Sequence, residues 1–353
     1  MTFEISVEPY TLPLSAPLRT GAGVIERRRG FAIQIEREGT VGIGEASPLP
    51  GWTESYDTCR QSLERAEAEW ARTSIDNSKL PTSSPAARHG LGLAGLDAAA
   101  RDTGRPLSVY LAGEGCSSSV PVNAIVGECD VNETVAAAEQ AVVEGFSVIK
   151  CKVGSGPVRA DIERLRAVDD AIDEEIELRL DANRAWSPEE AGAVCTALSD
   201  LPIQYLEEPV SNPSPGTLDR LSRAGLPIAL DETLLDIGLG ELDRWLEVVE
   251  AVVLKPMALG GIDRALAHAR AVSDSGVTPV VSTTVDAVIA RTAAVHLAAA
   301  LPTNAAAGLG TAGLLSEDLA PDPAPVTDGA ITVPRSPGIG TVGPWPDTAP
   351  DQP

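Results

Sequence analysis

The segment Ile149-Lys150-Cys151-Lys152-Val153 begins a stretch in which short apolar runs end in charged or polar residues. The same pattern returns at 178–183 (LRLDAN), 205–209 (YLEEP), 229–233 (ALDET) and 252–256 (VVLKP). An apolar run that ends in charge is typical of a buried parallel strand whose C-terminal end reaches a functional site. The charged ends lie roughly 25 to 30 residues apart, the length of one strand-and-helix unit. The stretch therefore predicts a parallel α/β barrel with its chemistry at one rim.

Lysine is rare in this chain. Of the 27 lysines and arginines, only Lys79, Lys150, Lys152 and Lys255 are lysines. Three of these four stand at the ends of predicted strands. Arginine keeps its proton near neutral pH, whereas a lysine in a site of low polarity can have its pKa lowered enough to act as a base. The placement of these lysines indicates that the chemistry of the site requires amine side chains.

Length and composition limit the possible classes of protein. A chain of 353 residues has room for a barrel and one smaller domain, and an apolar content of 43% excludes general disorder. The net charge of −24 argues against binding to nucleic acid or to an anionic membrane, because both would repel the protein. We expect a small-molecule partner with a carboxylate, held by the lysines.

The acidic, lysine-poor composition has two interpretations. One is a halophilic protein adapted to a salty cytoplasm, where screening makes the self-repulsion tolerable. The other is replacement of lysine by arginine in a GC-rich genome, and unfolding midpoints measured across molar KCl would distinguish them. The five cysteines form no CxxC pair, and neither a signal peptide nor an 18-residue apolar run is present. These features predict a cytoplasmic protein with reduced thiols.

The pattern along the chain predicts the domain organisation. Residues 1–115 form an α+β capping domain, with strands at 3–10, 30–37 and 40–44 and helices at 55–73 and 84–103. Residues 116–318 form the barrel, with strands at 120–126, 147–153, 177–183, 203–208, 228–232, 251–256, 278–284 and 305–309. Residues 319–342 pack back on the capping domain, and residues 343–353 form a disordered tail.

Carboxylates end three successive predicted strands. Residues two apart in a strand face the same way, so Asp181 shares a face with Asn183, and one member of each of the pairs 207/208 and 231/232 points inward. Three carboxylates without His or Cys suit a hard cation, and Mg²⁺ best of all. His89, His268 and His296 lie in helix-like segments away from the strand ends, which disfavours a histidine base.

Lysines end the strands on either side of the carboxylates. Lys150 and Lys152 share a face of one strand, and Lys255 ends another on the far side. An amine on each side of a metal-bound carboxylate substrate is suited to removing a proton from the carbon next to that carboxylate. The metal and the amines would stabilise the resulting enediolate.

The order KxK, DxN, EEP, DE and a lysine before proline resembles the enolase superfamily, specifically its muconate-cycloisomerase-like subgroup. The resemblance covers nearly the whole chain, from the capping domain to RSPGIG at 335–340. Within the subgroup, LPLSAPLRTGAGVIERRRG (12–30), GEASPLPGW (44–52) and LRLDANRAW (178–186) are similar to the o-succinylbenzoate synthases of menaquinone biosynthesis. The resemblance implies a modified TIM barrel, of (β/α)7β type, with a capping domain completed by the C-terminal segment.

The resemblance also implies roles for individual residues, all of them expectations. One Mg²⁺ ion would be held by Asp181, Glu207 and Asp231. Lys152 would be the base that removes the proton and then the acid that protonates the departing hydroxyl, and Lys255 would stay cationic. Substrate contacts would come from Lys150, Arg179 and Asn183.

Other reactions use the same residues. Relatives with these lysines racemise N-acylamino acids such as N-succinylamino acids, epimerise dipeptides or cycloisomerise muconate-like substrates. Residues 308–311 (GLGT) lack the acidic pair associated with dipeptide epimerases. A non-catalytic metal-binding scaffold is the alternative from a different class, and Lys152→Ala separates it from an enzyme, because a scaffold would lose no activity.

Overall fold

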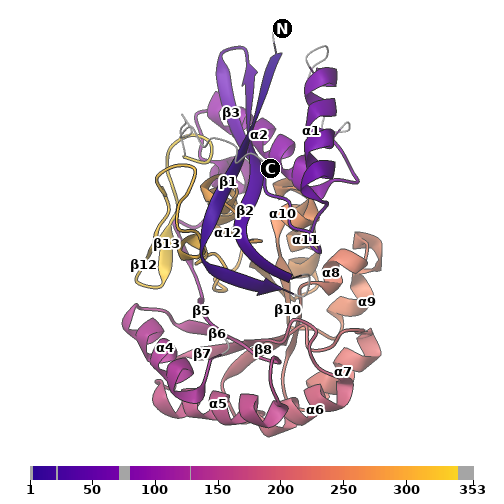
Figure 1. The fold of residues 1–353 in the computed structure, drawn as a ribbon, viewed down its shortest axis with the longest axis vertical. Coiled ribbons are helices and arrows are strands. Elements are labelled where there is room, and N and C mark those ends of the chain that lie inside the picture. The colour runs from indigo at the N-terminus through magenta and orange to yellow at the C-terminus, as the bar shows by residue number, and fades with distance from the viewer. Residues whose placement is uncertain (1–2, 21–22, 71–79, 128, 341–353) are drawn as a thin grey trace.

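The structure is a computed structural model that describes residues 3–20, 23–70, 80–127 and 129–340. The predicted tail at 343–353 lies outside these residues. In Figure 1 a β-rich N-terminal part stands over a curled parallel sheet, whose outer side is covered by helices. Within the described residues, no helix has the length and apolar character needed to cross a membrane.

The N-terminal part is a three-stranded antiparallel sheet in the order β1-β2-β3, formed by β1 (Phe3–Thr20), β2 (Gly23–Arg37) and β3 (Thr40–Ala46). The first two strands are longer than predicted, because prolines at 13 and 17 do not end β1. It is an edge strand, where proline removes no ladder hydrogen bond, and the register shifts between Pro13 and Leu18 instead.

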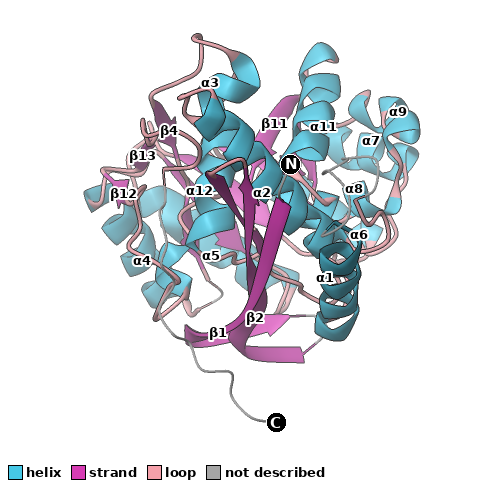
Figure 2. Cartoon of the chain, turned by 90° about the horizontal axis from the view of Figure 1, so that it is seen from above, coloured by secondary structure: helices cyan, strands magenta, loops and turns pink. Residues whose placement is uncertain are grey.

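Two helices, α1 (Tyr56–Trp70) and α2 (Pro85–Asp102), lie beside this sheet (Figures 1 and 2). Glycines let α2 approach β3 closely. A Cβ atom at Gly42 would stand 2.1 Å from the carbonyl oxygen of Ala94, and one at Gly44 would stand 2.0 Å from that of Gly90. Any larger residue at either position would push the helix off the sheet.

The parallel sheet has seven strands in the order β11-β10-β9-β8-β7-β6-β5. They are β5 (Ala124–Val126), β6 (Val148–Lys152), β7 (Glu177–Asp181), β8 (Ile203–Glu207), β9 (Ile228–Leu230), β10 (Ala251–Leu254) and β11 (Thr278–Val281). The helices between and after them are α4 (Val131–Val143), α5 (Val158–Ala171), α6 (Pro188–Ala197), α7 (Pro215–Arg223), α8 (Thr233–Asp236), α9 (Asp243–Leu246), α10 (Pro256–Leu259), α11 (Ile262–Asp274) and α12 (Val288–Ala299). The predicted parallel α/β barrel architecture is confirmed.

The barrel closes differently from the prediction. The strand expected at 305–309 is reduced to single bridges, Val122 to Ala307 and Ser282 to Gly308. The strand expected at 120–126 is divided, because β4 (Ser119–Pro121) pairs outside the barrel with β13 (Ala330–Thr332), which also pairs with β12 (Val326–Thr327). Both halves alternate apolar residues, so the sequence carried no signal of the division.

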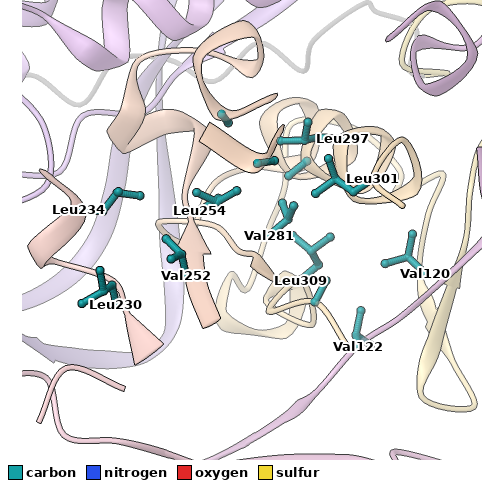
Figure 3. Close-up of a cluster of buried hydrophobic side chains, with 14 of the residues drawn as sticks. Val120, Val122, Leu230, Leu234, Val252, Leu254, Val281, Leu297, Leu301 and Leu309 are labelled. Atoms are coloured by element: carbon teal, nitrogen blue, oxygen red, sulfur yellow. The ribbon is translucent and has the colours of Figure 1, made fainter. Parts of the chain in front are cut away.

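Apolar side chains fill the barrel on both sides of its sheet. Inside, Tyr205, Ala229, Ala251, Val253 and Val280 form one buried cluster. Outside, strand residues pack against the surrounding helices, and Figure 3 shows Val281 of β11 beside Leu309, with Leu297 of α12 nearby. This packing fixes the strand ends that carry the charged residues.

The C-terminal segment returns to the N-terminal part. The N–H of Leu107, which begins α3 (Leu107–Ala112), donates to the carbonyl of Gly338 at 2.7 Å, and the N–H of Ile339 donates to Asp97 Oδ1 of α2 at 2.8 Å. His296 of α12 lies 3.3 Å from the carbonyl oxygen of Ile339. The residues at which the predicted domains divide stay predictions.

A buried carboxylate joins the N-terminal sheet to the barrel. Glu45 of β3 accepts hydrogen bonds from the N–H groups of Ala287 (2.8 Å) and Ala290 (2.9 Å) at the start of α12, and from the Tyr10 hydroxyl at 2.8 Å. Carboxylates are favourable at helix N-termini. Burial, reinforced by the charge of Asp286, nonetheless raises the pKa of Glu45 to about 7.

We expect Glu45 to make stability depend on pH near neutrality. Its folded-state pKa of about 7 lies above the unfolded value of about 4.3, so its contribution is complete below the unfolded pKa and is lost as pH rises through 7. The free energy of unfolding should fall by about 2 kcal/mol between pH 5 and pH 8. Urea unfolding of Glu45→Gln should show a flatter pH dependence, and Glu36→Gln, on the exposed side of β2, should keep the wild-type slope.

Candidate active site

The predicted carboxylates and lysines meet at the C-terminal ends of the barrel strands. Lys152 is paired in register with Asp181 between β6 and β7, and Asp181 with Glu207 between β7 and β8. Asp231 directly follows β9, and Lys255 directly follows β10. All three carboxylate residues are at most 2% exposed. The strands therefore bring together the five side chains to which the sequence analysis gave catalytic or metal-binding roles.

Each carboxylate is paired with an amine. Lys150 Nζ lies 2.7 and 2.8 Å from the two oxygens of Glu207 and 2.8 Å from Asp181 Oδ2. Lys152 Nζ lies 2.7 Å from the same Asp181 oxygen, and Lys255 donates to Asp231 Oδ2. The three buried carboxyl groups are thus each in contact with at least one lysine amine.

The pKa shifts follow from burial and from these pairs. Burial alone would raise the pKa of Asp181, but Lys150 and Lys152 outweigh it and hold that pKa below its usual value. Burial would likewise lower the pKa of Lys150, yet Asp181 and Glu207 raise it well above its usual value. Burial raises the pKa of Asp231 despite Lys255, and Glu207 adds to the rise. Lys150 therefore stays charged beside Lys152.

The donor set fits a hard divalent cation. Among the residues that the structure describes, no three Asp, Glu, His or Cys side chains converge as a ready metal site, because the carboxylates turn to lysines. However, Asp181, Glu207 and Asp231 offer only carboxylate oxygens, which Mg²⁺ prefers. Glu232 Oε2 is also buried nearby with no hydrogen-bond partner among the described residues. This concentration of buried negative charge favours further positive charge.

Asn183 lies with Lys152, as the alternation of residues predicted. Its Oδ1 accepts a hydrogen bond from Lys152 Nζ at 2.6 Å, and its Nδ2 donates to Glu232 Oε1 at 2.9 Å. Its φ of 42° is in the left-handed region, which Asn tolerates better than most residues. The backbone turn after β7 thereby sets the direction of the Lys152 amine.

Trp52 covers the other lysine, a contact that the sequence analysis did not predict. Lys255 Nζ lies 3.6 Å from the centroid of the Trp52 ring, a cation–π contact that favours the charged amine. The loop that carries Trp52 is held at both ends, by Arg28 bonds to the Pro48 carbonyl (3.1 Å) and by Glu54, which accepts from Ala86 N at 3.0 Å. The N-terminal part thus completes the site.

Arg179 does not reach the open end of the barrel. It is 1% exposed and pairs in register with Lys150, two residues before Asp181. Its guanidinium donates to Gln204 Oε1 (2.7 Å), Asn123 Oδ1 (3.1 Å) and the Ala306 carbonyl (2.6 Å). These partners support a role inside the barrel rather than the predicted contact with substrate.

Arg179→Met is expected to lower the free energy of unfolding by about 2 to 4 kcal/mol, because it leaves buried acceptors without donors. The KM for substrate should stay near the wild-type value. Urea unfolding and steady-state kinetics check both parts. Arg223→Met, on the exposed face of α7, is the matched control and should change stability by less than about 0.5 kcal/mol.

The rim of the barrel opposite the carboxylates is lined by apolar and small residues. Ile125 of β5 is 44% exposed and pairs with Lys150, so it faces the barrel interior. In the closing segment, a Cβ atom at Gly308 would lie 2.6 Å from Ser282 Oγ, which explains the glycine there. Two of the histidines that the sequence analysis set aside contact backbone carbonyls elsewhere: the His89 ring lies 2.9 Å from the Glu45 carbonyl oxygen, and the His268 ring lies 2.8 Å from that of Arg264.

Comparison with known proteins identifies the family. Residues 133–343 match the family described as "Enolase C-terminal domain-like", which covers more than half of the chain. The chain belongs to the enolase superfamily. The N-terminal part of this enolase-superfamily chain, residues 4–98, matches the family described as "MenC, N-terminal domain".

Several superfamily members resemble the chain to a similar degree. It is 30% identical to the hydrophobic dipeptide epimerase of Enterococcus faecalis over 84% of this chain and 86% of the relative. It is 28% identical to the o-succinylbenzoate synthase of Pasteurella multocida over 87% and 88%. A crystal structure of the Enterococcus faecalis V583 dipeptide epimerase with Mg and L-Leu-L-Tyr has a TM-score of 0.83, with 26% identity, and covers 96% of this chain and 99% of that one. Chloromuconate cycloisomerases are also among the relatives.

Proposed function

We propose that this protein is an o-succinylbenzoate synthase, a lyase of menaquinone biosynthesis. It would dehydrate 2-succinyl-6-hydroxy-2,4-cyclohexadiene-1-carboxylate to o-succinylbenzoate. The observation that supports this choice within the superfamily is the match of residues 4–98 to the MenC N-terminal domain. That domain supplies Trp52 over Lys255, so it borders the reacting groups directly.

The arrangement of the lysines suits a syn dehydration. Lys152, with 35% of its side chain exposed, takes the proton from the ring carbon that bears the carboxylate. The same ammonium then gives that proton to the hydroxyl on the same face, the C–O bond breaks, and water leaves as the ring becomes aromatic. One residue thus serves as base and as acid, and no other reactant is consumed.

The remaining charged residues bind and stabilise. One Mg²⁺ ion, held by Asp181, Glu207 and Asp231, would supply positive charge to the substrate carboxylate. Lys255 keeps its charge beneath Trp52 and faces the enediolate from the side opposite Lys152. Lys150 adds a second positive charge beside Lys152 and would help to place the substrate carboxylate.

Racemisation of N-succinylamino acids, or epimerisation of dipeptides, is the second candidate. It is favoured by amines on two sides of the site, on β6 and after β10, which allow proton delivery to either face. A dipeptide, however, carries an ammonium group that needs an anionic partner when buried. Residues 308–311 offer only glycine, leucine and threonine, which favours substrates without that charge.

Parallel kinetics test the proposal. The purified protein is assayed in Mg²⁺ and high KCl with the cyclohexadiene generated in place, an N-succinylamino acid, a hydrophobic dipeptide and cis,cis-muconate. We expect kcat/KM for dehydration of at least about 10⁴ M⁻¹s⁻¹, the lower end of ordinary enzymes, and lower values for the others. Racemisation, epimerisation or lactone formation without dehydration would contradict the proposed reaction and leave the site intact.

A further inference from the structure

The second glutamate of the 207/208 pair has no role in the proposed reaction, although it is 1% exposed. We propose that Glu208 is a positioning residue, which fixes the backbone of Asp231 so that the Asp231 carboxylate is presented to the metal. This inference rests on the metal site of the proposed function. It concerns a residue that touches neither substrate nor metal.

The Glu208 carboxylate accepts hydrogen bonds from the segment that follows β9 and from the turn after β7. Its Oε1 accepts from the N–H groups of Asp231 (2.9 Å) and Thr233 (2.7 Å). Its Oε2 accepts from the Thr233 hydroxyl (2.9 Å) and from Arg184 Nε (3.1 Å). Each oxygen thus receives two hydrogen bonds, which compensates the cost of burying the charge.

Asp231 needs such support because the strand ends before it. β9 contains three residues and stops at Leu230, and the pairing of β8 with β9 ends at Glu207 and Ala229. The Asp231 N–H therefore goes to the Glu208 side chain rather than to a neighbouring strand. On the β8 side the Glu208 carboxylate thus takes the place of a strand partner, so we expect the direction of the Asp231 carboxylate to depend on it.

The backbone conformation of Glu208 serves the same arrangement. Its φ of 42° is in the left-handed region, as are the φ angles of Asn183 (42°) and Arg184 (65°). Such angles are uncommon for Glu and Arg, and there they are maintained only where surrounding contacts impose them. The Arg184 N–H donates to the Glu208 carbonyl at 2.7 Å, so the two turns hold each other. Together these two turns place the Glu208 carboxylate next to the backbone of Asp231.

Magnesium titration of three variants tests the proposal. Isothermal titration calorimetry measures Mg²⁺ affinity for the wild type, Glu208→Ala and Glu208→Gln, and urea unfolding checks that each remains folded. Loss of the support should weaken Mg²⁺ binding about 10- to 100-fold in Glu208→Ala. Glu208→Gln keeps an oxygen for the Asp231 and Thr233 N–H groups, so it should lose clearly less.

The control is Glu190→Ala. Glu190 also accepts a backbone hydrogen bond, from Ser187 N at 2.9 Å, but it does so at the exposed start of α6. Its loss should lower stability without changing Mg²⁺ affinity. Equal weakening in Glu208→Gln and Glu208→Ala would overturn the proposal, since the charge and not the hydrogen bonds to Asp231 would then matter. Unchanged affinity in a folded Glu208→Ala would overturn it as well.

Failure of the metal site itself gives a different result. If the wild type does not bind Mg²⁺, the metal site of the proposed function is wrong, and the role of Glu208 falls with it. If the wild type binds and Glu208→Ala binds equally well, the metal site stands and only the positioning role is lost. The two failures are therefore distinguishable without an activity assay.

Discussion

Lys152→Ala is expected to lower kcat for dehydration by about 10³-fold or more. The variant lacks the amine that removes the proton and returns it to the hydroxyl, and a general acid–base group contributes about 10²- to 10⁴-fold per step. Stability should change little, because the Lys152 side chain is 35% exposed. Stopped-flow or steady-state absorbance assays of the cyclohexadiene measure the loss.

Lys152→Arg separates basicity from charge. Arginine can keep an ion pair with Asp181, which lies 2.7 Å from the lysine amine, but it does not release its proton near neutral pH. We expect a loss comparable to that of Lys152→Ala. Near-normal activity in Lys152→Arg would mean that this position supplies charge only, and wild-type activity in Lys152→Ala would remove Lys152 from the mechanism.

Removal of divalent cations with EDTA should abolish dehydration, by about 10³-fold or more, and added Mg²⁺ should restore it. Without the cation, the charge on the substrate carboxylate is not neutralised as the proton leaves. The protein should stay folded in EDTA, because each of the three carboxyl groups is paired with a lysine amine of the chain itself. Activity and far-UV circular dichroism are measured on the same samples.

Glu207→Gln is the matching substitution. It removes one predicted ligand charge but keeps the side-chain volume, and we expect Mg²⁺-dependent activity to fall as far as it does in EDTA. Glu190→Gln is the control, since Glu190 lies at the exposed start of α6 and is not among the three predicted ligands. A Glu207→Gln protein with wild-type activity and Mg²⁺ requirement would contradict the assignment of the ligands.

The sequence was most informative where an apolar run ends in a charged residue and such runs recur at regular spacing. Apolar runs that end in Lys152, Asp181, Glu207, Asp231 and Lys255 predicted the strands, their order and the rim at which they meet. Parallel strands place equivalent ends together, so spacing alone gave the site. The strands that lead to these five residues end one or two residues before the predicted ends, because turns and short helices begin there.

Features that depend on contacts distant in sequence were not predictable. The segment 44–52 (GEASPLPGW) was quoted for its resemblance to the family, but the contact of Trp52 with Lys255 across the interface between the N-terminal part and the barrel was not predicted. Arg179 lies two residues before Asp181 and faces the same way. The alternation of residues therefore predicted that Arg179 points into the barrel, but not how far below the rim its side chain lies. The role of Glu208 depends on the early end of β9, which the apolar pattern at 228–232 did not indicate.

A crystal structure with Mg²⁺ and o-succinylbenzoate tests the central claim most directly. The account predicts one ion with oxygens of Asp181, Glu207 and Asp231 at about 2.1 Å, and the product carboxylate beside it. The Lys152 and Lys255 amines should stand on opposite sides of the ring carbon that lost its proton. The account would be contradicted by an ion bound elsewhere, or by Lys152 and Lys255 amines that both lie on the same side of the product ring.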